Sequence, residues 1–481
     1  MSDLLIALDL GTTGVRALVV GEDGKIGARA YLPLATAFPR PGWVEQDPGE
    51  MWESSAAVVR DALAQAGREA RDVGALGIVT QRSTVVAWDS ESGAPLAPAI
   101  GWQDTRTGER VAAMRAAGLP ITTLASATKL EWWLANDAAI QDAARRGTLR
   151  FGTPDAWLTF KATDGAAHVT DPGQASCTAL FDPAAGDWAA PLADLFGVPL
   201  EPLPQVVGTS EVVGHTPRAL FGAELPVAAR AGDQQASAFG QGVHEPGLAK
   251  LTLGTSAMLD VHTGVELRPP PPAAFPLALW RLADGATSFC LEGQVITAGA
   301  AVDWLVSLGV ADSAAEVDRM ARAVPDSGQV VFVPALQGLG TPHGDDSARG
   351  LFAGLSRGSS REHLARAVLE GVAQRCVDLL DPLGVQADPL CCDGGLGRSD
   401  FLLQAVADLS GRRVARASET EATGVGIAWL AGLASGRFAS PAECRALLEA
   451  PTLFEPELGS EAREHARAQW QAAVRRARET V

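Results

Sequence analysis

The chain has 481 residues, too many for one ordinary hydrophobic core, so roughly two to four domains are expected. Apolar residues make up 47% and charged residues 20% of the chain, which excludes bulk disorder. The formal net charge of −18 repels phosphate backbones and anionic lipid, so neither nucleic acid nor a membrane surface is an expected partner.

The sequence shows no sign of export or of a membrane span. Its start, from Met1 to Asp9, lacks the basic region and the cleavage site of a signal peptide. The most apolar later stretch, residues 424–435, is shorter than the roughly 20 residues that a membrane helix needs. The six cysteines form no CxxC pair, and Cys391 and Cys392 stand in an apolar run typical of buried thiols. We therefore expect a soluble protein of a reducing compartment, the cytoplasm.

Residues 4–80 predict a hairpin, a helix and a further strand. The apolar run 4–10 is typical of a buried strand, residues 11–14 of a turn and residues 15–20 of a returning strand. A helix is expected over 47–65, with Asp47 as N-cap and a proline at its first position, before a strand at 75–80. Further helices are expected at 129–136, 362–379, 424–436 and 460–480.

The opening pattern returns near the middle of the chain. An apolar strand meets Gly254-Thr255-Ser256 and a second strand leaves it, as at Gly11-Thr12-Thr13. Two such hairpins suggest duplicated halves, each with a loop that faces a nucleotide. Because Gly-Thr pairs are common, coincidence is the alternative.

Asp9 ends a predicted strand directly before the first Gly-Thr tip. A carboxylate beside free backbone N–H groups and two hydroxyls suits a hydrated Mg²⁺ on a polyphosphate. An aspartate that only completes the turn is the alternative. The sequence has no GxxxxGK[ST] motif and no GxGxxG that follows a strand and opens a helix, so any nucleotide site here is neither a P-loop nor a Rossmann site.

Two later segments also contain candidate functional residues. Asp233 stands where an apolar segment gives way to a small-residue helix, and a carboxylate there could serve as the base for an alcohol nucleophile or only cap the helix. Asp393-Gly394-Gly395 lies between a predicted strand and a predicted helix, which is a plausible platform for adenosine or a simple turn. No Cys/His cluster, HExxH or GxSxG motif is present.

Together these motifs resemble the FGGY family of carbohydrate kinases, most of all its glycerol kinase branch. The likeness covers residues 5–436 and rests on many weak markers in one order. They are DLGTT at 9–13, TQR at 80–82, GWQDTR at 101–106, SATK at 126–129, FGTPDAW at 151–157, HVTD at 168–171, GDQQ at 232–235, LGT at 253–255, LEG at 291–293, AGA at 298–300, FVP at 332–334, GLG at 338–340, ARGLFAGL at 348–355, LE at 369–370 and DGG at 393–395.

The resemblance implies an α/β fold of two actin-like ATPase (ribonuclease H-like) domains. Each would hold a mixed five-stranded sheet flanked by helices, with the ligand cleft between the domains. The implied division is 1–245 for the N-terminal domain on the substrate side, 246–440 for the C-terminal domain on the nucleotide side, and 441–481 for a helical extension. A homodimer or homotetramer is an open expectation.

The resemblance also implies roles for individual residues. Asp233 would be the base that takes the proton of the substrate hydroxyl, and Asp9 the carboxylate associated with Mg²⁺. ATP would be bound by Thr12, Thr13, Gly14 and Arg16 in the first loop, by Gly254 and Thr255 in the second, and by Gly299, Asp303 and Gly395. The acceptor would be bound by Arg82, Ser83, Trp102, Leu124, Asp233 and Gln234.

Three positions depart from the glycerol kinase pattern. Ser83 stands where glutamate is usual, Leu124 where a substrate-facing tyrosine is usual, and Asp303 where glutamine is frequent near the nucleotide. The sole tyrosine, Tyr31, is far from this segment and is not expected to replace it. The first two changes remove hydrogen-bonding groups from the acceptor site, each worth on the order of 1 kcal/mol.

The leading interpretation is ATP-dependent phosphorylation of a primary hydroxyl, with glycerol as first candidate. Kinases of another polyol, a ketopentose or a sugar acid are alternatives, because Ser83 and Leu124 would leave room for them. A non-catalytic nucleotide-binding sensor is a further alternative, which the retained Asp233 and Arg82 disfavour.

Overall fold

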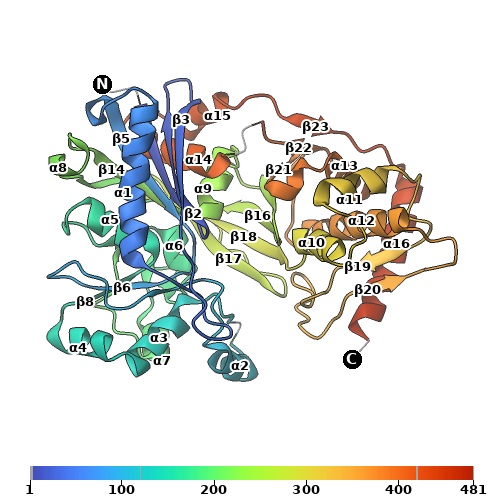
Figure 1. Cartoon of the computed structure of the whole chain (residues 1–481), viewed down its shortest axis with the longest axis horizontal. Helices are drawn as coiled ribbons and strands as arrows, with labels where there is room; N and C mark the ends of the chain where they lie inside the picture. Colours follow the sequence, from blue (N-terminus) through green and yellow to red (C-terminus); the bar gives the residue numbers. More distant parts are fainter. Residues whose placement is uncertain (1–3, 120, 419–420, 480–481) are drawn as a thin grey trace. The chain divides into compact units, whose positions relative to one another are not determined.

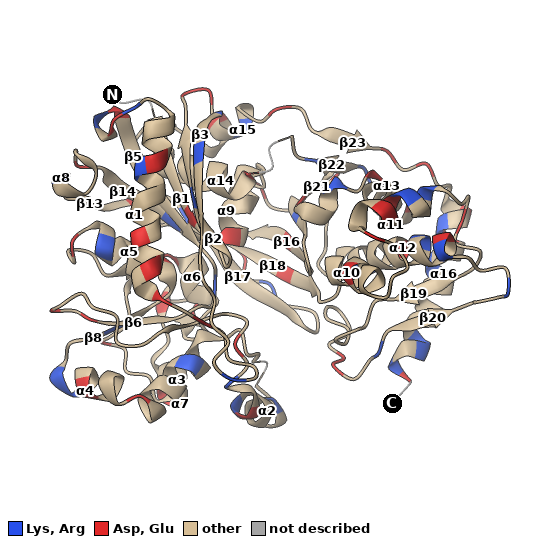
Figure 2. Ribbon diagram, in the orientation of Figure 1, with Lys and Arg blue, Asp and Glu red and all other residues tan. Residues whose placement is uncertain are grey.

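The computed structural model describes residues 4–119, 121–418 and 421–479. The chain groups into two compact units (Figure 1). Unit 1 consists of Met1–His244, Leu277–Phe289 and Glu421–Leu448, and unit 2 of Glu245–Pro276, Cys290–Thr420 and Glu449–Val481. Figure 2 marks both acidic and basic residues on the helices of the chain, among them α4 (Ala138–Arg146), and the last helix is α16 (Ser460–Arg478).

The sheet of unit 1 begins with the predicted hairpin. Its order is β13-β14-β5-β1-β2-β3, and β1 and β2 are antiparallel. β5 runs parallel to β1, and β14 runs parallel to β5, so three neighbouring strands point the same way. The strands are β1 (Leu4–Leu10), β2 (Gly14–Val20), β3 (Ile26–Pro33), β5 (Val73–Thr80), β13 (Ser210–His215) and β14 (Pro226–Gly232).

Helices bury both faces of this sheet, which explains the unbroken apolar run of β1. Ile6 and Leu8 belong to a core with α1 (Pro48–Gln65) and α5 (Pro154–Ala162). As predicted, Asp47 caps α1: its Oδ1 accepts the N–H of Gly49 at 2.7 Å. The other face is covered by α14 (Ala422–Ala434).

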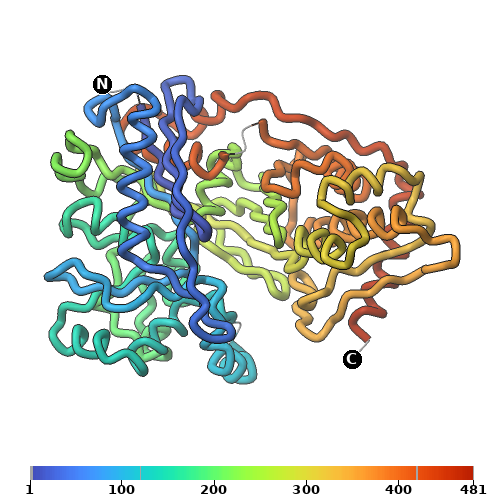
Figure 3. The backbone as a smooth tube through the Cα atoms, in the orientation of Figure 1, coloured from blue at the N-terminus to red at the C-terminus, as the bar shows by residue number. Residues whose placement is uncertain are grey.

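The position of α14 differs from the expected division at residues 246–440, because this helix groups with unit 1. Gly424 and Gly426 leave no room for a Cβ atom, since Leu18 of β2 and the backbone of α9 (Asp233–Gly240) lie against them. Ser210 Oγ also donates to the carbonyl of Leu430 at 2.8 Å. Figure 3 shows this orange segment beside the blue N-terminal strands. Long-range packing, rather than position in the chain, therefore decides where the helix belongs.

Residues 84–205 add a second hydrophobic cluster to unit 1. Trp133 and Phe151 stack within it at a centroid distance of 6.2 Å. Its elements, together with the remaining short ones of the unit, are β4 (Glu45–Gln46), β6 (Val86–Asp89), β7 (Ala99–Ile100), α2 (Gly108–Ala116), α3 (Ser126–Asn136), α4, β8 (Leu149–Gly152), β9 (Val169–Thr170), α6 (Pro172–Ser176), β10 (Phe181–Asp182), β11 (Asp187–Trp188), α7 (Ala190–Phe196), β12 (Gln205–Val206), α8 (Arg218–Phe221) and α15 (Pro441–Ala446).

The second sheet has the order β17-β18-β16-β15-β21-β22-β23. β15 and β16 form the second predicted hairpin, and β21 runs parallel to β15. The strands are β15 (Ala249–Leu253), β16 (Ala257–Gly264), β17 (Ala274–Arg281), β18 (Thr287–Val295), β21 (Leu390–Asp393), β22 (Val414–Arg416) and β23 (Thr452–Phe454). Residues 277–281 of β17 and 287–289 of β18 group with unit 1. Outside this sheet, the elements of unit 2 are α10 (Gly299–Ser307), α11 (Ala314–Arg322), β19 (Val331–Val333), β20 (Leu351–Ala353), α12 (Arg361–Leu380), α13 (Asp400–Ser410) and α16.

The two sheets share one five-stranded order. In the first it is β3-β2-β1-β5-β14, and in the second β18-β16-β15-β21-β22. In each sheet, the first strand of the hairpin pairs on its other side with a parallel strand, and that strand pairs with a further parallel strand. The edge strands β13, β17 and β23 raise the totals to six and seven among the described residues. The expected five-stranded core is therefore present twice, with extra strands at the edges.

The C-terminal helix α16 is held to α12 by a buried carboxylate. Asp378 accepts hydrogen bonds from Arg375 at 2.9 Å, Arg467 at 2.7 Å and the indole of Trp470 at 3.0 Å. All six cysteines are free. Within the described part of the chain, no helix is both long and apolar enough to cross a membrane.

Candidate active site

Three of the predicted site residues lie at the ends of neighbouring parallel strands of unit 1. Asp9 lies near the end of β1, Arg82 two residues beyond β5, and Asp233 directly after β14. The register aligns these ends, since Thr80 of β5 pairs with Leu10 on one side and with Gly232 on the other. Carboxyl ends of parallel strands are where α/β sheets place their ligands.

Arg82 and Asp233 form an ion pair at this edge. Arg82 Nε lies 3.3 Å from Asp233 Oδ1, and the two side chains are 13% and 40% exposed. Asp233 is the first residue of α9 and not its N-cap, which is Gly232. Asp233 Oδ1 also accepts the backbone N–H of Gln234 at 2.8 Å. A partly exposed carboxylate oriented in this way can accept a proton from a bound hydroxyl.

Gly232 allows this contact because the arginine lies across its backbone. A Cβ atom at this position would be 2.8 Å from both Cγ and Cδ of Arg82 and 2.5 Å from Gln235 Oε1. Any side chain here would therefore displace the arginine from the carboxylate.

The turn after Arg82 is supported by the SATK segment. Ser83 is buried with a φ of 64°, and its carbonyl accepts from Lys129 Nζ at 2.8 Å and from Ser126 Oγ at 3.3 Å. Burial lowers the pKa of Lys129 to about 7, although the charge of Asp104 opposes the shift. Lys129 thus stabilises the backbone turn directly after Arg82.

Asp9 lies close enough to Asp233 for the charge of Asp233 to affect its pKa. Burial raises the pKa of Asp9 to about 7, the charge of Arg16 opposes that rise, and Asp233 and Glu421 add to it. A cation close to Asp9 would stabilise the charged form of this buried carboxyl group and lower its pKa.

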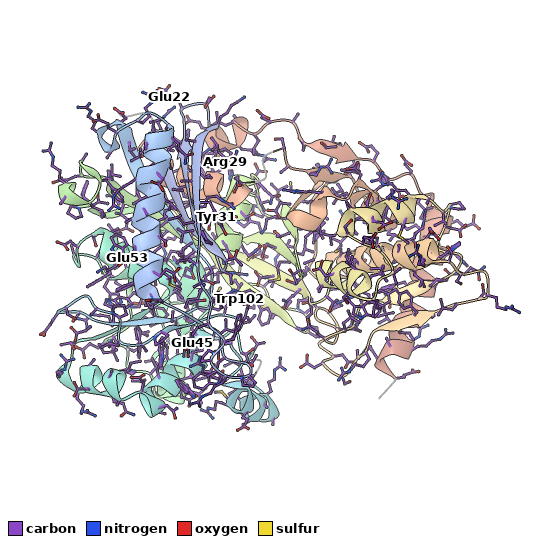
Figure 4. The ribbon with its side chains drawn as sticks, viewed as in Figure 1. Glu22, Arg29, Tyr31, Glu45, Glu53 and Trp102 are labelled. Carbon is purple, nitrogen blue, oxygen red and sulfur yellow. The ribbon has the colours of Figure 1, made fainter. Side chains whose placement is uncertain are left out.

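The first Gly-Thr loop is held by side chains from three other segments. The indole of Trp102 donates to Thr12 Oγ1 at 2.9 Å, and Gln46 Nε2 donates to the Thr12 carbonyl at 2.8 Å. The hydroxyl of Tyr31 donates to the carbonyl of Thr13 at 3.2 Å (Figure 4 labels Tyr31 and Trp102). Trp102, predicted on the acceptor side, therefore contacts the predicted phosphate loop.

Arg16, the other predicted phosphate ligand of this loop, is paired with a carboxylate. It forms an ion pair with Glu421, and Arg29 approaches the same glutamate at 3.8 Å. The side chain of Arg16 is 35% exposed, so it remains accessible from solvent.

The second Gly-Thr loop packs against the start of α10 within unit 2. The N–H of Gly299 donates to the carbonyl of Gly254 at 2.9 Å, and Ala298 and Ala300 donate to that of Thr255 at 3.1 and 3.0 Å. A Cβ atom on Gly299 would lie 2.6 Å from Gly254 O, so only glycine allows this approach. Asp303 lies one turn further along α10.

The DGG segment joins this loop at the end of β21. Asp393 is paired in register with Thr252 of β15, and Gly394 has a φ of 90°. A Cβ atom on Gly394 would lie 2.4 Å from the carbonyl oxygen of Leu253. A Cβ atom on Gly395 would meet no heavy atom within 4 Å. Gly254, Thr255, Gly299 and Gly395 therefore gather around the ends of two parallel strands, with open space at Gly395.

Two family models match almost the whole chain. The N-terminal domain model of the FGGY family of carbohydrate kinases matches residues 4–240, and the C-terminal domain model matches residues 249–435. The chain belongs to the FGGY family of carbohydrate kinases.

Relatives and solved structures agree with this membership. A glycerol kinase of Citrifermentans bemidjiense is 41% identical, with 98% of each chain covered. The crystal structure of Plasmodium falciparum glycerol kinase with ADP is 26% identical, with a TM-score of 0.93 and 98% of each chain covered. The xylulose kinase of Rhodospirillum rubrum is 27% identical, with a TM-score of 0.84 over 98% of this chain and 97% of the other.

The glycine-lined surface of unit 2 fits a nucleotide in this carbohydrate kinase. The close approach of Gly299 to Gly254 is possible only without a side chain, and a Cβ atom on Gly395 would meet no heavy atom within 4 Å. Such surfaces admit phosphate oxygens and a flat base to the main chain.

A divalent cation fits this kinase only if its ligands come mainly from phosphate and water. Among the described residues, no group of three or more His, Cys, Asp or Glu side chains could hold a metal ion. Asp9 offers a carboxylate beside the first loop, and Mg²⁺ on a polyphosphate commonly needs only one or two protein carboxylates.

Sequence reasoning missed the residues that support the site. Gln46 and Tyr31 contact the first loop of this kinase from distant segments, and no local pattern marks them. Lys129 belongs to the SATK marker, but its hydrogen bond to the carbonyl of Ser83 was not predicted. Gln234 lies in the first turn of α9, directly after Asp233, and its role in acceptor binding stays a prediction. Leu124 is half-buried, and its backbone N–H donates to Thr122 Oγ1 at 3.3 Å; its role in acceptor binding stays a prediction.

Proposed function

We propose that this FGGY kinase transfers the γ-phosphoryl group of ATP to a primary hydroxyl of glycerol. The observation that carries the proposal is the Arg82–Asp233 pair at the ends of β5 and β14, where a partly exposed carboxylate lies 3.3 Å from a guanidinium. Glycerol is proposed because glycerol kinases match the chain over its full length at about 40% identity.

Each residue of the proposed site would have its own role in the reaction. Arg82 donates hydrogen bonds to acceptor hydroxyls, and Asp233 accepts the proton of the hydroxyl that attacks. The new bond joins that oxygen to the γ-phosphorus, while the bond from the γ-phosphorus to the bridging oxygen of ADP breaks. Thr12, Thr13 and Arg16 would stabilise charge on the phosphate oxygens from one loop, and Thr255 from the other.

Mg²⁺ is proposed as the accompanying cation, and Asp9 as the carboxylate nearest to it. When bound, the ion would neutralise phosphate charge. The raised pKa of Asp9, about 7, means that this carboxyl is partly protonated near neutral pH unless a cation is close. We further propose a cytoplasmic protein, since its six cysteines are free thiols, and an assembly of two or four copies, which light scattering would test.

A second acceptor class has its own support. Ser83 and Leu124 supply neither the carboxylate nor the phenol expected of a glycerol pocket. A larger polyol or a ketopentose would then compete with glycerol. If the alignment is right, Ser83→Glu together with Leu124→Tyr lowers the KM for glycerol, and if that double variant gains nothing, this interpretation of the pocket is wrong.

Coupled ADP release over a panel of polyols, ketopentoses and sugar acids tests the proposal. Asp233→Asn should lower kcat by about 100-fold or more, because a positioned base is lost. ATP affinity should stay within about threefold, since Asp233 binds the acceptor and not the nucleotide. The matched control is Asp303→Asn in α10 of unit 2, which should alter the KM for ATP and not that for the acceptor. A wild type that phosphorylates no member of the panel would refute the proposed function.

A further inference from the structure

Cys177 lies beside the Arg82–Asp233 pair and has no role in the function proposed so far. It directly follows α6, and it is half-buried, as is Cys391, whereas the other four cysteines are buried. Arg82 Nη1 donates to Cys177 Sγ at 3.8 Å, while Nε of the same guanidinium lies 3.3 Å from Asp233. The arginine therefore bridges a thiol and the proposed base.

The end of α6 is fixed to the strands that carry this pair. The buried amide of Gln174 donates to Thr80 Oγ1 at 2.8 Å and to the carbonyls of Thr80 and Ala231 at 3.2 and 3.4 Å. Asp171 caps the helix by accepting the N–H of Gln174 at 2.9 Å. Because β5 leads to Arg82 and β14 to Asp233, the same backbone sets the position of all three groups.

The hydrogen bonds of the thiol allow Cys177 Sγ to accept from Arg82. Cys177 Sγ donates its proton to the carbonyl of Gly173 at 3.4 Å, which leaves sulfur lone pairs for the guanidinium. Sulfur is a weak acceptor, but a charged donor strengthens the bond. Contacts on both sides of the guanidinium restrict its rotamers, and a restricted group loses less entropy when substrate binds.

We propose that Cys177 is a positioning residue for acceptor binding: it holds Arg82 against Asp233, and an acceptor bound to that pair covers the thiol. The inference rests on the proposed function. A small polyol within hydrogen-bond reach of Arg82 and Asp233 lies close to Cys177, because the sulfur is 3.8 Å from the guanidinium.

Thiol modification tests the placement of Cys177. Methyl methanethiosulfonate would be applied to the Cys391→Ser protein, which lacks the other half-buried thiol. The thiolate attacks the sulfenyl sulfur, a disulfide to the methylthio group forms, methanesulfinate leaves, and dithiothreitol reverses the reaction. We expect loss of activity that peptide mass spectrometry assigns to Cys177. Saturating glycerol, or the acceptor of highest turnover, should slow this loss by about fivefold or more, and ATP alone by less than about twofold.

Kinetics of two variants test the positioning role. Cys177→Ala should raise the KM for the acceptor about threefold to tenfold while leaving the KM for ATP within about twofold. Cys177→Ser should restore the acceptor KM to within about twofold of wild type, because a hydroxyl also accepts from Arg82 and donates to Gly173. A purely structural role would move both KM values together and would not separate serine from alanine.

The outcomes separate the two claims. An active enzyme whose Cys177 reacts equally fast with and without acceptor would overturn the inference and leave the proposed function standing. Equal changes in both KM values for Cys177→Ala would do the same. A wild-type protein without turnover on any acceptor would overturn both.

Discussion

Gly232→Ala is expected to impair acceptor use in this kinase without unfolding it. The backbone at Gly232 has φ −74° and ψ 154°, a conformation open to alanine, so the change adds no backbone strain. The new methyl carbon would lie 2.8 Å from two carbons of Arg82, well inside the roughly 3.5–4.0 Å of a favourable carbon contact. The arginine must therefore move, and its 3.3 Å contact with Asp233 is lost.

The size of the effect follows from that lost contact. A hydrogen bond to a charged group contributes about 1.5–3 kcal/mol, which corresponds to a fall of about 10- to 150-fold in kcat/KM for the acceptor. The assay is coupled ADP release with acceptor varied at saturating ATP. Calorimetric ATP affinity should stay within about twofold, because the altered residues lie on the proposed acceptor side.

Gly108→Ala is the matched control, since a Cβ atom on this first residue of α2 would meet no heavy atom within 4 Å. It should leave kcat/KM unchanged. In an Arg82→Ala background, Gly232→Ala should have little further effect, because the group that it displaces is already gone. A single Gly232→Ala variant that keeps acceptor kcat/KM within about threefold would refute the reasoning.

Three further predictions concern stability and nucleotide binding. Asp9→Asn should raise Tm at pH 7.5 while lowering activity. The pKa of Asp9 in the folded protein, about 7, lies above its usual 3.8, so ionisation of Asp9 destabilises the fold as pH rises from about 4 to about 7. Calorimetry at pH 4 should therefore show no gain in Tm. Asp378→Ala should lower the free energy of unfolding by about 3–5 kcal/mol, measured in urea, because it leaves Arg375 and Arg467 without their shared carboxylate. In wild type, burial raises the pKa of Asp378, but the nearby His343 and the charges of Arg375 and Arg467 outweigh burial and lower this pKa to about 2. This stability is therefore present above pH 4 and lost as pH falls toward 2. Thr255→Val should weaken ATP binding in calorimetry with the acceptor KM unchanged, and an unaltered ATP affinity would remove the second loop from the phosphate site.

Local elements were predictable because their causes are local. The hairpin of β1 and β2 follows from an apolar run, a Gly-Thr turn and a second apolar run. Helix α1 begins where Asp47 and Pro48 predict, since capping involves only neighbouring residues. The second hairpin repeats the first, and the shared five-stranded order of the two sheets supports the inferred duplication.

What the tertiary structure decided is which distant residues meet. The order β14-β5-β1 brings Asp9, Arg82 and Asp233 to one edge, and this pairing depends on strands far apart in the chain. The same order places Cys177 against Arg82, because Gln174 ties α6 to both strands. By itself the sequence determined the loops, the turns and the family. The neighbours of each catalytic group depend on long-range packing, since burying both faces of a sheet selects contacts that no local spacing encodes.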